Sequence, residues 1–177
     1  MVGDSITGLI SACRSDLQRI DGRSDWLRFI KGYFSNRGFR AVVYYRLARY
    51  LMLKRVRYLP ALIKARSISI TGAEIACEAD IGPGLVITHP VGVVVGSRVK
   101  IGHNCTIMQG VNLGEKWADR SGKQVPIIGN DVILGAGSKV LGGVEIGDRV
   151  MVGANSVVME SVPPDKVVGG IPACILR

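Results

Sequence analysis

Aliphatic residues recur at every sixth position through most of the second two-thirds of the chain. They form three sets with constant spacing inside each set: Ile75, Ile81 and Ile87; Val95, Ile101, Ile107 and Leu113; and Ile128, Leu134, Val140, Ile146, Val152 and Val158. Glycine follows many of them, and a small or β-branched residue such as Ala79, Val91 or Ser138 comes four positions later. An amphipathic helix does not repeat every six residues, so the pattern indicates a repeat architecture.

Each hexad is interpreted as a short strand followed by a sharp turn, and three hexads complete one coil. The aliphatic side chain and the residue four positions later point into a narrow interior, and glycine permits the tight corner. Stacked coils pair their backbone N–H and C=O groups with the coils above and below. The sequence therefore predicts a mainly β fold, a parallel β-helix, over residues 68–177.

The first third of the chain has a helical period instead. Apolar residues recur at three- and four-residue steps after Gly38, and Pro60 interrupts the run, which predicts a helix near 38–53 and a shorter segment after it. Residues 1–20 fit either a further short helix or a frayed terminus. We therefore expect a small α-helical region over 1–67 in front of the β-helix.

The charged residues are also unevenly distributed between the two regions. The chain carries a net charge of +9, and residues 1–67 alone hold fourteen Lys/Arg against four Asp/Glu. A basic segment suggests an anionic partner, although a solvated helix face has the same composition. Between residues 23 and 66 aromatic side chains alternate with the arginines, which favours peripheral contact with an anionic inner-membrane surface. Nucleic acid is disfavoured because no nucleic-acid-binding motif is visible.

Other features place the chain in the cytoplasm. No apolar run is long enough to span a membrane, and the N-terminus does not resemble a signal peptide. The four cysteines show no C-x-x-C spacing, so we expect reduced thiols. With only two histidines beside them, no metal site is expected.

The repeat is interrupted twice, and function is expected at the interruptions. The step from Ile87 to Val95 is eight residues and contains Thr88, His89 and Pro90. The step from Leu113 to Ile128 is fifteen residues, so 114–127 must leave the coil as an excursion loop.

His89 is the candidate general base, because an imidazole can accept a proton from a hydroxyl near neutral pH. The alternative is a histidine that only caps a turn, but its place at a corner insertion favours a catalytic role. His103 lies at an ordinary hexad turn and is expected to face solvent.

The hexad pattern resembles the hexapeptide-repeat acyltransferase superfamily. The stretch DIGPGLVITHPVGVVVG and the later ILGAGSKVLGGVEIG are similar to serine acetyltransferases and to their short relatives in exopolysaccharide biosynthesis, as is the helical RGFRAVVYYRLARYL. The resemblance implies that the β-helix is left-handed. It also implies a homotrimer with acyl-transfer sites between neighbouring chains.

The same resemblance implies a mechanism with acetyl-CoA as the acyl donor and no metal. His89 would deprotonate the acceptor hydroxyl, which attacks the thioester directly, and Glu74 stands where the family has an aspartate that orients the histidine. Gly114, Ala136 and Ala154 would line the path of the pantetheine, and Lys139 would reach a phosphate.

The chain departs from the serine enzymes at three places, and these departures bear on the acceptor. Thr88 replaces an aspartate, Gln124 and Val125 replace an Arg-His pair, and the chain ends soon after its closing turn. These changes remove charges suited to a zwitterion. They favour a sugar hydroxyl of a cell-surface polysaccharide or its precursor, contacted by Thr88, Gln124 and Trp117.

Three alternatives are considered. The first is serine O-acetylation for cysteine synthesis. The second, a metalloenzyme on the same solenoid, is disfavoured because it would need three histidine ligands and the chain has two histidines. The third is a non-catalytic, membrane-associated scaffold, for which His89 would be dispensable.

Overall fold

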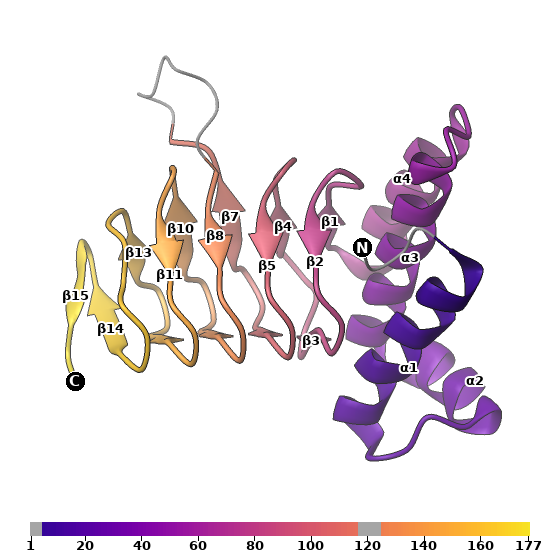
Figure 1. Ribbon diagram of the computed structural model, residues 1–177, viewed down its shortest axis with the longest axis horizontal. Helices are drawn as coiled ribbons and strands as arrows, with labels where there is room; N and C mark the ends of the chain where they lie inside the picture. Colours follow the sequence, from indigo (N-terminus) through magenta and orange to yellow (C-terminus); the bar gives the residue numbers. More distant parts are fainter. Residues whose placement is uncertain (1–4, 117–124) are drawn as a thin grey trace.

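The computed structural model describes residues 5–116 and 125–177. It shows a prism of short strands with a group of helices packed on one end and the C-terminus at the other end (Figure 1). The helices are α1 (Ile6–Asp21), α2 (Trp26–Ser35), α3 (Arg37–Leu53) and α4 (Leu59–Thr71).

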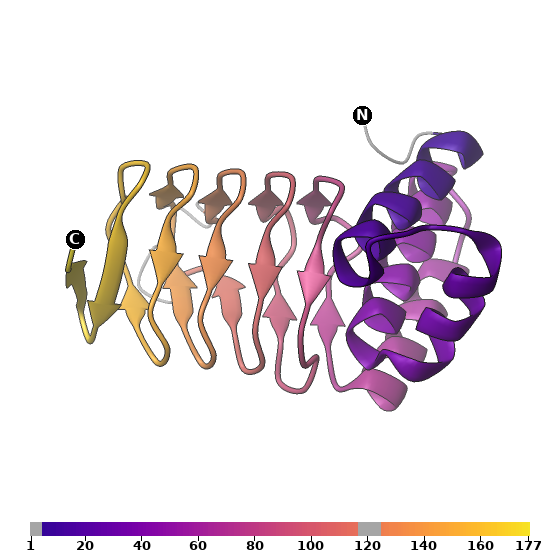
Figure 2. The same cartoon turned by 90° about the horizontal axis from the view of Figure 1, so that it is seen from below.

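The strands follow one another around the prism, three to a coil. They are β1 (Glu74–Ile75), β2 (Asp80–Ile81), β3 (Val86–Ile87), β4 (Val94–Val95), β5 (Lys100–Ile101), β6 (Thr106–Ile107), β7 (Asn112–Gly114), β8 (Ile127–Ile128), β9 (Ile133–Leu134), β10 (Lys139–Leu141), β11 (Glu145–Ile146), β12 (Met151–Val152), β13 (Val157–Val158), β14 (Val167–Gly170) and β15 (Ala173–Ile175). From β1 to β13 every third strand stacks on the same face, and β14 then stacks on β12. The turned view shows the stacked coils along the prism (Figure 2).

Three parallel sheets form the faces of the prism. Their strand orders are β1-β4-β7-β10-β13, β11-β8-β5-β2 and β15-β14-β12-β9-β6-β3, and only the final pair, β14 with β15, is antiparallel. This arrangement confirms the predicted hexapeptide-repeat β-helix behind a helical region. The helical region runs past residue 67, because α4 ends at Thr71 and Gly72 caps it in the left-handed conformation.

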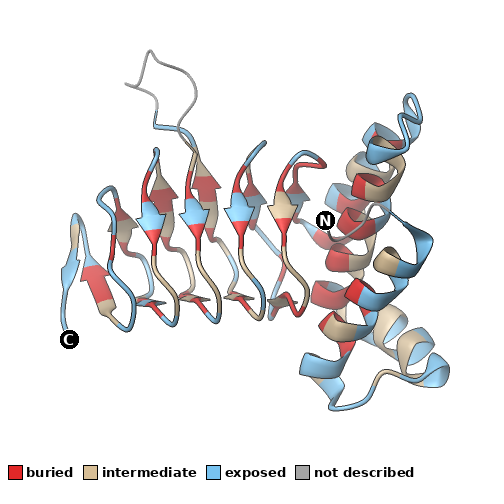
Figure 3. Cartoon of the chain, viewed as in Figure 1, coloured by how far each residue is buried: buried red, intermediate tan, exposed pale blue. Residues whose placement is uncertain are grey.

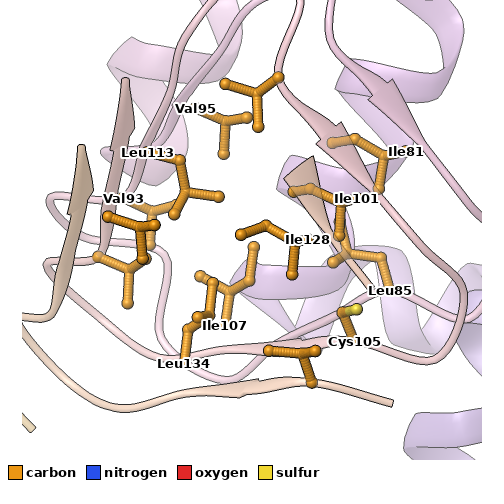
Figure 4. Packing of buried hydrophobic residues seen from close by; sticks show 14 of the residues in the cluster. Ile81, Leu85, Val93, Val95, Ile101, Cys105, Ile107, Leu113, Ile128 and Leu134 are labelled. Atoms are coloured by element: carbon orange, nitrogen blue, oxygen red, sulfur yellow. The ribbon is translucent and has the colours of Figure 1, made fainter. Parts of the chain in front are cut away.

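The core of the prism is a column of the predicted aliphatic residues (Figure 4). Ile81, Ile107 and Leu134 are at most 1% exposed. Residues four positions after an aliphatic of the sets, such as Ala79 after Ile75 and Val132 after Ile128, are fully buried. One prediction is wrong: Val91 is exposed, and Val93 is buried in its place. The two residues inserted at this corner shift the inward position along the chain by the same amount.

The main helix predicted from the sequence is present, and the structure shows that the described N-terminal residues form a helix rather than a frayed terminus. The helix predicted near 38–53 is α3, and residues 6–21 form α1, whose N-cap Ser5 accepts a hydrogen bond from the N–H of Gly8. Pro60 lies in the first turn of α4, where its missing N–H costs little. Buried residues of α3 face the β-helix (Figure 3).

Arginines of the helices cover the open end of the first coil. The Arg46 guanidinium donates to the carbonyls of Ile81 and Gly82 and pairs with buried Asp16 at 3.0 Å. Asp16 also accepts from the Leu85 N–H at 2.8 Å. The end of a solenoid exposes polar backbone groups and needs a cap, which these side chains supply.

Two more arginines serve the same cap. Arg49 bonds the carbonyl of Ala79 and the carboxylate of Asp80, and Arg19 bonds the carbonyl of Gly84. Some of the basic residues of the first third therefore stabilise the fold by bonding the first coil. Arg46 and Arg49 are buried, so they cannot contribute to the predicted membrane contact of residues 23–66.

Within the described residues, no helix is long and apolar enough to cross a membrane.

Candidate active site

His89 lies on a corner of the prism between β3 and β4. Its side chain is exposed, while the following Pro90 is buried and holds the corner against the core. The N–H of Gly92 donates to the carbonyl of Gly72 at 3.0 Å, which ties the inserted residues to the end of α4. Among the described residues, the imidazole has no hydrogen-bond partner. It is therefore accessible to a substrate.

The same corner continues through the later coils and forms what we call the His89 edge: His89, Gln109, Ala136 and Ala154. Backbone hydrogen bonds connect it from coil to coil, since Gly110 N–H donates to Val91 O at 3.0 Å and Gly137 N–H to Gln109 O at 2.7 Å. The N–H of Asn155 then donates to Ala136 O at 2.8 Å. The structure thus brings Ala136 and Ala154 onto the edge that carries His89.

Glycines keep the His89 edge narrow. Gly92, Gly110 and Gly137 have positive φ angles of 74°, 69° and 72°. A Cβ on Gly92 would lie 3.4 Å from Gly110 Cα, and one on Gly110 would lie 3.4 Å from Gly137 Cα. The positive φ, more than the space, requires glycine at these positions. The result is an edge with small side chains beyond Gln109, along which an extended ligand can lie.

Lys139 extends from β10 toward this edge. Its ammonium donates to the carbonyls of Gly110 and Gly137, both at 2.9 Å. A lysine ammonium has three donors, so one remains for a ligand oxygen. The geometry places a positive charge beside the His89 edge but fixes it to the backbone, which the sequence could not reveal.

Glu74 lies on β1, and its N–H donates to the carbonyl of Val93 at 2.9 Å, just beyond the His89 corner. Its carboxylate does not bond His89; instead it pairs with the ammonium of Lys64 from α4 at 3.1 Å. Sequence reasoning missed Lys64, because nothing in the helical pattern distinguishes it from the other basic residues.

The excursion loop begins at a different corner. Gly114 ends β7 on the far side of its sheet from Gln109, and the N–H of Gly142 donates to its carbonyl at 2.9 Å. At the start of the loop Glu115 pairs with Arg98 at 3.0 Å. Gly114 is therefore not on the His89 edge of its own chain. Trp117 and Gln124 lie outside the described residues, and Thr88 is exposed next to His89.

The buried cysteines are unsuited to form a covalent acyl intermediate. Burial raises the pKa of Cys13 to about 12 and that of Cys105 to about 11, so neither thiol supplies a thiolate at neutral pH. In the described part of the chain, no group of three His, Cys, Asp or Glu side chains could hold a metal ion. His103 is exposed, and its backbone N–H donates to Asn130 Oδ1 at 3.0 Å.

The chain matches two family models, the bacterial transferase hexapeptide (six repeats) over residues 126–159 and the hexapeptide repeat of succinyl-transferase over residues 92–116. The coiled prism and these matches define a hexapeptide-repeat transferase. A serine acetyltransferase of Helicobacter pylori is 41% identical over 136 residues, covering 77% of this chain and 79% of the relative. The chain belongs to the serine acetyltransferase family.

Solved structures agree with this assignment. Soybean serine acetyltransferase complexed with serine is 34% identical, with a TM-score of 0.86, and the match covers 95% of this chain and 69% of that one. The Brucella abortus serine acetyltransferase in complex with coenzyme A is also 34% identical, with a TM-score of 0.85, over 93% and 66%. However, the chain spans only 57% of the length of a Synechococcus elongatus serine acetyltransferase, to which it is 43% identical over 139 residues, covering 78% of this chain.

These comparisons correct the predicted acceptor. The sugar acceptor is wrong, because relatives at 41–44% identity are named serine acetyltransferase, and the expected closeness to exopolysaccharide O-acetyltransferases finds no support. The prediction assumed that only charged side chains at the positions of Thr88, Gln124 and Val125 could hold a zwitterion. Backbone N–H and C=O groups can also bond an ammonium and a carboxylate.

Proposed function

We propose that this protein transfers the acetyl group of acetyl-CoA to the hydroxyl of L-serine. The observation that carries the proposal is an exposed histidine at the corner insertion of a β-helix whose relatives are serine acetyltransferases. A solved relative contains coenzyme A, which supports acetyl-CoA as the donor. Cytoplasmic location, where this donor is made, stays a prediction.

The proposed reaction is a direct transfer. His89 takes the proton of the serine hydroxyl as the oxygen attacks the thioester carbonyl, which forms a C–O bond and a tetrahedral oxyanion. The oxyanion collapses with cleavage of the C–S bond, and the imidazolium returns the proton to the departing thiolate. The small side chains of Ala136 and Ala154 give the pantetheine arm room along the His89 edge, and Lys139 offers one donor to an oxygen of the coenzyme.

The proposal includes the homotrimer that the family resemblance implies. A single chain keeps the His89 edge apart from the corner where Gly114 and the excursion loop lie. Side-by-side packing of three prisms would bring the Gly114 corner of one chain to the His89 edge of its neighbour. The sites would then lie between chains, with Gly114 contributed by the neighbouring chain.

Acceptor choice tests the proposed function most simply. Release of free thiol from acetyl-CoA is expected to depend on L-serine and to be saturable, and L-alanine, which lacks only the hydroxyl, should not support it. Glucose provides hydroxyls without the ammonium and carboxylate. Equal rates with glucose and L-serine, or no rate with L-serine from a protein that binds acetyl-CoA, would contradict the proposal.

Glu74 is proposed to orient the His89 imidazole once substrate is bound. Glu74→Gln removes the charge at constant size and is expected to lower kcat by about tenfold or more, since orienting carboxylates contribute at least that much. Glu74→Asp restores the residue that the family has here and should keep most of the activity. Lys64→Met tests whether the observed ion pair competes with this role. If it does, kcat of Lys64→Met rises above wild type; equal kcat in all variants would remove Glu74 from the mechanism.

A further inference from the structure

Helix α2 presents an apolar face that nothing in the described chain covers. Leu27, Phe34 and Trp26 are 77%, 71% and 71% exposed, and Ile30 follows on the same side of the helix at 39%. The opposite side, with Phe29 and Gly32, packs against Phe39 and Leu17 of the neighbouring helices. Part of the apolar surface of α2 thus faces outward, and packing within the fold does not account for its apolar residues there.

The exposed face continues into an apolar hollow between α1, α2 and α3. The hollow has a volume of about 360 Å³, and Trp26 forms part of its wall together with Ile10 and Leu47, which are also exposed. Trp26 therefore joins the hollow to the outer face of α2. This end of the molecule lies far from the C-terminal coils (Figure 1).

The acids of the helical end are already paired. Within residues 5–67 the carboxylates are Asp16, Asp21 and Asp25; Asp16 pairs with Arg46, and the other two pair with Arg28 at 2.6 and 3.4 Å. Exposed cations remain around the apolar face without an acid of this region to balance them. They are Arg14 on the rim of the hollow, Arg23 before α2, Lys31 on α2 and Arg37 at the start of α3.

Exposed tryptophan, leucine and phenylalanine with cations around them suit one kind of partner. We propose that the apolar face of α2, framed by Arg23, Lys31 and Arg37, docks on an anionic lipid membrane surface. The apolar side chains enter the boundary between headgroups and acyl chains, and the cations pair with lipid phosphates. A second copy of this surface is a poorer partner, because a symmetric contact would bring the uncompensated cations of both copies together. The inference is independent of the acceptor.

Vesicle flotation of the full chain tests the proposal. Wild-type protein is expected to float with phosphatidylcholine vesicles that contain about 30% phosphatidylglycerol, to bind pure phosphatidylcholine more weakly, and to lose binding as salt screens the charges. Leu27→Ser with Phe34→Ser should weaken binding by about tenfold or more, because it removes the inserted side chains. Both side chains are more than 70% exposed, so the double variant is expected to keep its fold.

A matched control uses exposed apolar residues at the other end of the prism. Ile171 and Leu176 are 73% and 66% exposed, and their replacement by serine should leave flotation unchanged. Acetyl-CoA thiol release by each variant separates this proposal from the proposed function, since the α2 variant should retain it. Wild-type protein that stays in the soluble fraction overturns the proposal. So does an equal loss of binding in both double variants, or self-association that only the α2 variant abolishes.

Discussion

Replacing His89 with alanine is expected to lower the rate of serine-dependent thiol release by about 10²–10⁴-fold, the usual contribution of a general base. The imidazole is exposed on the edge where acetyl-CoA is proposed to lie, and its removal leaves the serine hydroxyl without a group to take its proton. The loss should appear in kcat, with little change in the affinity for acetyl-CoA.

The chain provides its own control for this experiment. His103 is also exposed, but it lies at an ordinary corner of the prism with its N–H bonded to Asn130. His103→Ala should keep wild-type activity. A His89→Ala protein that folds and still transfers acetyl groups at the wild-type rate would exclude His89 as the base. Another group on the prism would then have to take the proton of the serine hydroxyl.

Removing the carboxylate of Asp16 is expected to destabilise the fold by about 3–5 kcal/mol, as breaking a buried ion pair generally does. Asp16 is fully buried, and its loss strands the buried charge of Arg46 and the N–H of Leu85. Because this pair links α1, α3 and the first coil, thermal unfolding of Asp16→Ala should begin at much lower temperature.

An exposed pair of similar geometry serves as the control. Arg149 bonds both carboxylate oxygens of Asp165 at 2.6 and 2.7 Å on the surface of the later coils. Asp165 has a positive φ of 64°, which asparagine tolerates better than alanine, so Asn is the replacement that removes only the charge. Solvent-exposed ion pairs contribute little to stability, so Asp165→Asn should leave the melting temperature nearly unchanged. Equal effects of the two substitutions would mean that the helical cap does not depend on the buried pair.

The sequence predicted the β-helix because its period is physically unambiguous. Every aliphatic of the three sets falls on an inward position, from Ile75 at 5% exposure to Leu134 at 0%. The error at Val91 arose because two inserted residues displace the inward position, and a sequence pattern does not say which residues of an insertion bulge outward.

The helical cap could not be predicted. A basic amphipathic pattern is the same whether its arginines face solvent or backbone carbonyls. Arg46 and Arg49 bond carbonyls of the first coil, which lies far from them in the sequence, so the pattern of α3 alone does not reveal these contacts. The charge of the first third therefore led to a prediction of membrane contact over residues 23–66 that included buried arginines. Only the outer face of α2 remains in the membrane contact that we propose.

The candidate site was predicted in part. The insertion pointed to His89, and the period places Ala136 and Ala154 on the same corner, but Gln109 on that edge and Lys64 beside Glu74 were missed. The acceptor was misjudged because the side chains at Thr88, Gln124 and Val125 were interpreted as excluding serine, whereas relatives at 41–44% identity are named serine acetyltransferase.

The most direct test of the account is a crystal structure of the protein with coenzyme A and L-serine bound. We predict that the thiol of coenzyme A lies within reach of the His89 imidazole, with the pantetheine arm running past Ala136 and Ala154 and the serine hydroxyl hydrogen-bonded to the imidazole. Coenzyme A bound on another edge of the prism, with His89 facing only solvent, would contradict the central claim that the His89 edge is the site of acetyl transfer.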